Sequence, residues 1–170
     1  SKTVETLGND QKNKEIAVLV RGQLCTALSR VLLHGFKSFK LIGRYHIWDF
    51  VNESCDATHK RIKAGGIKYS PAESTLTSAV VEVNSHEGMA NNPNIKFRSF
   101  VCCGLNHRQL HEWMQVLTMD KDVMAKFYEP WAFVHSNSEA LPQMAGAMQP
   151  LSIYTYTLSL DYELSRWDLH

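Results

Sequence analysis

Apolar residues recur at helical spacing along most of the chain, and the first long run predicts one helix over residues 15–34. A single stripe carries this run: Ile16, Leu19, Val20, Leu24, Ala27, Leu28, Val31 and Leu32. Gly35 follows His34 and predicts the helix end, because glycine readily adopts the left-handed conformation found there. Phe36 and Phe39 are then expected to fold back onto the stripe.

The next segments predict a short helix, a loop and a strongly capped helix. Residues 43–51 place aromatic side chains together, which predicts a short helix with a buried anchor. Residues 54–69 are polar and basic, and are interpreted as a helix end followed by a mobile loop. Ser70, Pro71 and Glu73 then form a strong helix start, with serine as cap and glutamate reaching back.

The second half predicts a series of short capped helices. A loop is expected over residues 84–94, after which Asn94 is expected to cap a helix over 95–105. Asn106 is expected to cap residues 107–117, and Asp120 to cap residues 121–128. Residues 141–160 are interpreted as one or two helices, with Pro150 at a kink or at the second start.

These patterns predict an all-α bundle of about seven or eight helices with no dependable strand. The expected division is a polar N-terminal extension over residues 1–14, a helical domain over 15–164 and a tail over 165–170. Trp48, Trp113 and Trp131 lie on or beside apolar stripes and are expected in the core. Trp167 lies in the polar tail, so it either contacts a partner or belongs to a frayed end of the chain.

Composition narrows the function classes. A formal net charge of +1 argues against broad nucleic-acid binding, which needs a basic excess. The four cysteines show no CxxC or zinc-finger spacing, so reduced thiols in a cytosolic protein are expected, with Cys25 and one of Cys102 and Cys103 in the core. No run of apolar residues is long enough for a membrane span, and the first residues lack the apolar stretch of a signal peptide.

Catalytic and metal chemistry find little support in the sequence. His107 and His111 are four residues apart on a predicted helix, but Arg108 stands where a zinc protease places glutamate, and no third ligand is evident. Nucleophile-elbow and phosphate-loop motifs are absent. The sequence therefore predicts no catalytic residue, no metal and no cofactor.

Five blocks in a fixed order carry the most specific signal in the chain. They are ALSRVLLHGFK (Ala27–Lys37), IWDFV (Ile47–Val51), FRSFVCCGLNHRQLHEWMQVL (Phe97–Leu117), FYEPWAFV (Phe127–Val134) and LSLDYEL (Leu158–Leu164). Their order and spacing resemble the RUN domain across most of the chain. Within that family, the RSFVCCGLN and YEPWAF segments and the QPL at 149–151 look most similar to the NESCA/iporin kind of adaptor.

The resemblance implies a mainly helical, non-enzymatic module that binds proteins. RUN domains are associated with Rab- and Rap-type small GTPases, vesicle traffic and kinesin motors, and the NESCA-like group with neuronal transport and signalling. The expected partners are therefore a small GTPase or a kinesin motor and kinase complex, with no nucleic acid and only indirect membrane association. The expected location is the cytoplasm, in neurons, on or near transport vesicles.

A basic strip made of Lys37, Lys40 and Arg44, with Arg30 beside it, is the preferred partner-binding site. Exposed Phe39, Leu41 or Ile42 next to these cations would suit a GTPase surface, with charge at the rim and apolar burial at the centre. The alternative is that these residues form a turn that only contacts solvent and binds no partner.

Two further arginines complete the predicted partner-binding set. Arg98 matches the central arginine of the family, either exposed for recognition or bonded to a helix end or an acid such as Asp49. Arg108 lies on the central helical face.

The alternative function is a peripheral membrane module. Lys60, Arg61, Lys63 and Lys68 would then meet anionic lipid.

Overall fold

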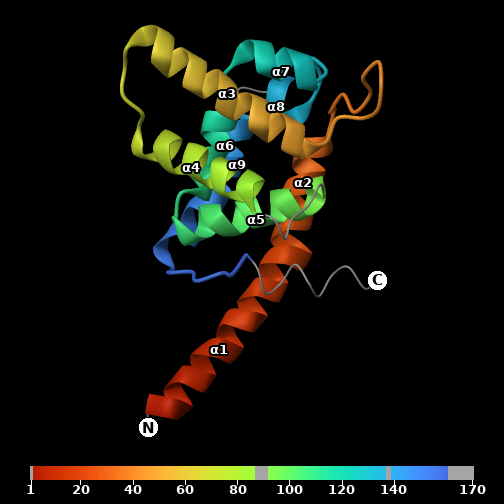
Figure 1. Cartoon of the computed structure of the whole chain (residues 1–170). Helices are drawn as coiled ribbons and strands as arrows, with labels where there is room; N and C mark the ends of the chain where they lie inside the picture. The colour runs from red at the N-terminus through yellow and green to blue at the C-terminus, as the bar shows by residue number, and fades with distance from the viewer. Residues whose placement is uncertain (1, 87–91, 137–138, 161–170) are drawn as a thin grey trace.

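The computed structural model describes residues 2–86, 92–136 and 139–160, and it forms a bundle of helices from which α1 projects (Figure 1). The helices are α1 (Lys2–Leu19), α2 (Cys25–Leu33), α3 (Ile47–Gly65), α4 (Pro71–Ser85), α5 (Pro93–Asn106), α6 (Leu110–Leu117), α7 (Lys121–Phe127), α8 (Phe133–Ser136) and α9 (Ala140–Met148). A 3-10 turn over Gln149–Ile153 follows α9. Within these ranges there are only isolated β-bridges and no strand, so the predicted all-α bundle is confirmed.

The first helix is longer than the sequence suggested. α1 begins at Lys2 rather than near residue 15, and it continues into α2 through a π-helical turn at Val20–Leu24. The polar residues before residue 15 carry no apolar stripe, so periodicity alone did not mark them as helical. The π turn widens the helix locally, and it contains the buried side chain of Arg21.

Within the described residues, Gln11–Leu33 is long and apolar enough to cross a membrane by length and composition alone. The sequence had predicted no such segment. One face of this rod is buried: Val20, Leu28 and Leu32 belong to the hydrophobic core. Other apolar side chains of the rod, Val18, Leu19 and Leu33, are more than half exposed.

Two of the predicted helix starts are confirmed. Ser70 and Glu73 form the expected capping box, in which the Ser70 hydroxyl accepts from the Glu73 amide at 3.2 Å and the Glu73 carboxylate accepts from the Ser70 amide at 2.8 Å. Asp120 accepts from the amides of Asp122 and Val123, at 3.0 and 2.9 Å. Both caps satisfy amides that a helix start leaves without intrahelical partners.

Two other predicted caps are wrong. Asn92, not Asn94, caps α5, because its side chain accepts from the amides of Asn94 and Ile95. Asn106 ends α5 instead of starting the next helix, since its side-chain amide pairs with the backbone of Leu158 in both directions at 2.9 Å. That long-range pairing outweighs the local capping preference, which sequence alone cannot show.

Helix α3 runs through most of the segment that was interpreted as a loop. Its buried face continues to Ile62 through Ser54, Cys55 and Thr58, which are small or partly polar side chains. The hydroxyl of Thr58 donates to the Ser54 carbonyl at 2.9 Å, which satisfies it inside the bundle. A helix face made of such residues leaves a weak apolar stripe in the sequence.

The C-terminal prediction was partly wrong. Instead of one or two helices over 141–160, α9 ends at Met148, the 3-10 turn follows, and residues 154–160 form no further helix. Residues 161–170, including Trp167 and the predicted tail, lie outside the described residues, as do residues 87–91 of the predicted 84–94 loop.

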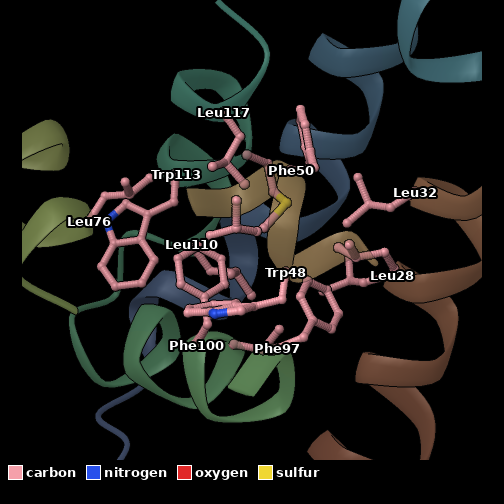
Figure 2. Close-up of a cluster of buried hydrophobic side chains, with 14 of the residues drawn as sticks. Leu28, Leu32, Trp48, Phe50, Leu76, Phe97, Phe100, Leu110, Trp113 and Leu117 are labelled. Atoms are coloured by element: carbon pink, nitrogen blue, oxygen red, sulfur yellow. The ribbon is translucent and has the colours of Figure 1, made fainter. Parts of the chain in front are cut away.

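An aromatic cluster from α3, α5 and α6 forms the centre of the core (Figure 2). Trp48 and Trp113 are buried as predicted, and each indole N–H has an acceptor: Asn84 Oδ1 at 3.0 Å and Thr75 Oγ1 at 3.1 Å. Trp131 is 62% exposed, so its predicted place in the core was wrong. It lies instead edge-on to the ring of His34, with ring centroids 5.4 Å apart.

The end of α2 is joined to the end of α7 at Gly35, and we call this contact the Gly35 junction. Gly35 has φ +69°, and its carbonyl accepts from the Glu129 amide at 2.9 Å. The Lys37 amide donates to the Phe127 carbonyl at 2.8 Å. A Cβ on Gly35 would lie 2.5 Å from the Cβ of Ala132, so the two backbones meet more closely than any side chain allows.

We predict that Gly35→Ala lowers the free energy of unfolding by about 2–4 kcal/mol, from left-handed backbone strain plus overlap with Ala132. Urea unfolding followed by tryptophan fluorescence measures the change. Gly146→Ala is the matched control, because a Cβ added at this position of α9 would meet nothing within 4 Å. This control should stabilise the protein by roughly 0.5–1 kcal/mol. Equal effects from both substitutions would contradict the assignment of a tight contact at Gly35.

Candidate functional site

The segment between α2 and α3 forms a projecting loop, residues 36–45, which we call the 36–45 loop (Figure 1). Its base is held by the Gly35 junction and by a β-bridge between Phe36 and Tyr128. Its two arms are joined by a bridge between Phe39 and Arg44 and by a 2.7 Å hydrogen bond from the Tyr45 amide to the Ser38 carbonyl. The loop is therefore a small hairpin on a fixed base.

Large apolar side chains stand exposed at the tip of this loop. The exposed fractions are 75% for Phe39, 105% for Leu41 and 89% for Ile42. Phe36 packs inward as predicted, with its ring 5.8 Å from that of Phe127, whereas the prediction that Phe39 also folds back was wrong. Apolar side chains gathered at a tip in this way are typical of an interaction site rather than of ordinary scattered surface residues.

Cations flank the exposed tip. The ammonium of Lys40 lies 4.9 Å from the centre of the Tyr45 ring, and the guanidinium of Arg44 lies 5.2 Å from the centre of the Phe39 ring. Lys37 differs from these two, because its ammonium donates to the Ala125 carbonyl at 2.9 Å and so ties the loop base to α7. Of the predicted basic strip, Lys40 and Arg44 border the tip, and Lys37 supports it.

Arg30 and Arg98 line the same pocket, whereas Arg108 lies at the far end of α5. This pocket lies at the base of the 36–45 loop, with Arg30 on α2 and Arg98 on α5. The Asp49 carboxylate accepts from the His46 amide at 2.7 Å, as part of the α3 cap, and no Arg98–Asp49 ion pair occurs among the described residues. Arg108 follows α5, about 15 Å along the helix axis from Arg98.

The two histidines weighed as metal ligands do not share a helix, contrary to the sequence interpretation. His107 is the C-terminal cap of α5, His111 lies in α6, and Arg108 between them reverses the chain at φ +58°. The His107 ring lies 5.8 Å from that of Trp113. No group of three or more His, Cys, Asp or Glu side chains converges within the described ranges.

The basic cluster of Lys60, Arg61, Lys63 and Lys68 is not a uniformly positive face. Arg61 forms an ion pair with Glu73, which is buried. Lys60 and Arg61 also line a surface hollow together with Glu53, Asp120 and Asp122. Neighbouring carboxylates therefore offset much of the charge that would attract anionic lipid.

The four cysteines are free thiols, and all are buried. Burial raises the pKa of Cys25 and of Cys103 to about 12, and that of Cys55 to about 11. A thiol whose pKa is raised in this way stays protonated at neutral pH and is a poor nucleophile. The prediction that Cys25 and one of the adjacent pair are core residues is confirmed, and both members of the pair are buried.

With this geometry in place, the comparison with known proteins identifies the class. The family model of the RUN domain matches residues 23–162, so the chain belongs to the RUN domain family. Small G protein signaling modulator 3 from Bos taurus is 32% identical over 182 residues, which cover 96% of this chain and 24% of that protein. The human AP-4 complex accessory subunit RUSC2 is 25% identical over 166 residues, covering 92% of this chain and 10% of that protein.

The chain thus spans about a quarter or less of the length of these relatives. The names of these relatives refer to small G protein signaling and to the AP-4 complex. Sequence reasoning missed the exposed Trp131, because its neighbours in YEPWAF carry the same apolar signal as core residues. Sequence reasoning also missed Arg21, which lines the same pocket as Arg30 and Arg98. A lone arginine inside an apolar stripe does not indicate a binding site.

We predict that the native thiols react with a thiol reagent at pH 8 at least about a hundredfold more slowly than those of the unfolded chain. The raised pKa values keep the thiolate fraction low until pH approaches 11, and burial blocks access. The absorbance of 5,5′-dithiobis(2-nitrobenzoic acid) measures the rate, and the guanidinium-unfolded chain is the control in which all four thiols react. Prompt labelling of a thiol in the folded protein would contradict this description of the core.

Proposed function

We propose that this domain is a non-enzymatic adaptor module that recognises a small GTPase of the Rab or Rap type through the 36–45 loop. The observation that carries the proposal is the exposed apolar tip, Phe39, Leu41 and Ile42, bordered by Lys40 and Arg44. The name of the relative at 32% identity, Small G protein signaling modulator 3, supports the same partner class.

The physical reason is the match between this loop and a GTPase surface. Large apolar side chains supply affinity when a partner buries them, and Phe39 and Leu41 have the size of such anchors. Lys40 and Arg44 at the rim would steer an acidic partner and fix its orientation. The fixed base of the loop lowers the ordering cost of binding, because the anchors are presented on a closed hairpin.

Finer parts of the proposal rest on the resemblance to the NESCA/iporin kind of adaptor. They place the module in the cytoplasm of neurons, on or near transport vesicles, where it would link a kinesin motor or kinase complex to axonal transport. The relatives named as accessory subunits of the AP-4 complex support a role as a module that serves a larger assembly. Membrane association would then be indirect, through the GTPase, and neither nucleic acid nor a cofactor would take part.

The alternative, a lipid-binding face at Lys60, Arg61, Lys63 and Lys68, has weaker support. The ion pair of Arg61 with Glu73 and the carboxylates beside Lys60 reduce its net positive charge. Steep salt dependence of binding to anionic vesicles would revive it.

We predict that Leu41→Asp/Ile42→Asp weakens GTPase binding at least about tenfold, because both anchors lose their apolar contact. Lys40→Glu/Arg44→Glu should chiefly slow association, by reversing the rim charge. Biolayer interferometry against purified Rab and Rap proteins, loaded with GDP or a non-hydrolysable GTP analogue, measures both effects. Circular dichroism checks that each variant folds.

Two variants serve as controls. Met119→Asp removes an apolar side chain that is 57% exposed outside the loop. Lys63→Glu/Lys68→Glu makes the same charge change within the rival basic cluster. Both should bind like the unmodified domain. Unchanged binding by the loop variants, or equal loss in the controls, would reject the 36–45 loop as the interface.

A further inference from the structure

A second feature lies at the base of the 36–45 loop, where a pocket of about 240 Å³ opens between α2, the start of α3 and the start of α5. Arginines from two sides share its wall: Arg21 and Arg30 from the rod formed by α1 and α2, and Arg98 from α5. His46, Ser29 and Asn94 add polar groups. Among the lining residues that the structure describes, none is aspartate or glutamate.

The three arginines differ in exposure, from buried Arg21 to exposed Arg30. Arg21 is 6% exposed and is fixed by hydrogen bonds to the Ser159 carbonyl at 3.0 Å and to Cys102 Sγ at 3.7 Å. Arg98 is half-buried, and Arg30 is exposed. The chain itself thus engages the Arg21 guanidinium, and the direct contacts to a ligand fall to Arg98 and Arg30.

The surrounding backbone adds to the positive potential. Helices α3 and α5, of 19 and 14 residues, both begin at this pocket, with Ile47 and Pro93 on its wall. The positive ends of their dipoles therefore point toward it, and the Asp49 carboxylate offsets that of α3, so the contribution of α5 is the larger one. Their first amides are already capped, by Asp49 and His46 in α3 and by Asn92 in α5, so the arginine side chains must supply the direct contacts.

We propose that this pocket binds a phosphate monoester, of the kind carried by inositol phosphates and by phosphoinositide headgroups. A monoester carries about −1.5 to −2 charges at neutral pH and three acceptor oxygens, which suits several guanidinium groups converging from different directions. A single carboxylate needs only one such fork. The pocket volume of about 240 Å³ also suits a phosphorylated ring, which is larger than a lone carboxylate.

This phosphate site is independent of the proposed GTPase site. The pocket is lined by the flanking helices and His46, whereas the exposed tip residues of the loop lie outside it. Variants of the pocket and of the tip should therefore affect different ligands, and either proposal can fail alone.

The test is isothermal titration of the domain with inositol 1,4,5-trisphosphate at physiological salt. We expect saturable one-site binding that Arg98→Gln and Arg30→Gln each weaken at least about tenfold, the loss of a charge-assisted pair. Arg98→Lys should recover only part of the affinity, because it keeps the charge but loses the fork. Lys121→Gln, an exposed charge on α7, is the matched control and should change binding less than about twofold.

Thermal unfolding confirms that each variant folds, and at one ligand concentration the melting temperature should rise less for Arg98→Gln than for the unmodified domain. Vesicles of phosphatidylcholine with phosphatidylinositol 4,5-bisphosphate then distinguish the source. Retention that the soluble ligand competes away supports a lipid headgroup, and soluble binding without retention supports a free inositol phosphate. Absence of saturable binding, or equal weakening by Lys121→Gln, overturns the proposal.

Discussion

The close contact between the Gly35 and Ala132 backbones is the constraint on which the functional geometry depends. The chain leaves α2, turns through a left-handed glycine and is held at once by hydrogen bonds to Phe127 and Glu129. Phe36 then packs among Phe127 and Tyr128, so the loop base belongs to the core. Without this junction, the ten residues of the loop would be a flexible connection between helices.

A fixed base changes what the exposed tip can do. Apolar side chains on a flexible segment would collapse inward or bind only at a large ordering cost. Here the hairpin contacts and the two cation–ring contacts hold Phe39, Lys40 and Arg44 on the outside. The domain is thus a helical body that holds the exposed tip of the 36–45 loop on a fixed base, with an arginine-lined pocket beside that base.

The sequence predicted the helices wherever one local signal decided the outcome, as at Ser70 and Asp120. It failed where tertiary contacts decided instead: Asn106 pairs with Leu158, and α3 buries Ser54 and Thr58. The same difference between local signals and tertiary contacts applies to the candidate site. The basic strip and its apolar neighbours could be chosen from adjacent residues, whereas the pocket joins Arg30 to Arg98, which only the fold brings together.

The most direct test of a presented recognition loop is site-specific photo-crosslinking at Leu41, with a photoreactive amino acid at exposed Met119 as the reference position. The domain would be mixed with purified Rab or Rap proteins in their GTP-analogue and GDP states. We expect a crosslink from position 41 that depends on the nucleotide state, and none from position 119. Crosslinks from position 119 alone, or equally from both positions, would contradict the presented loop.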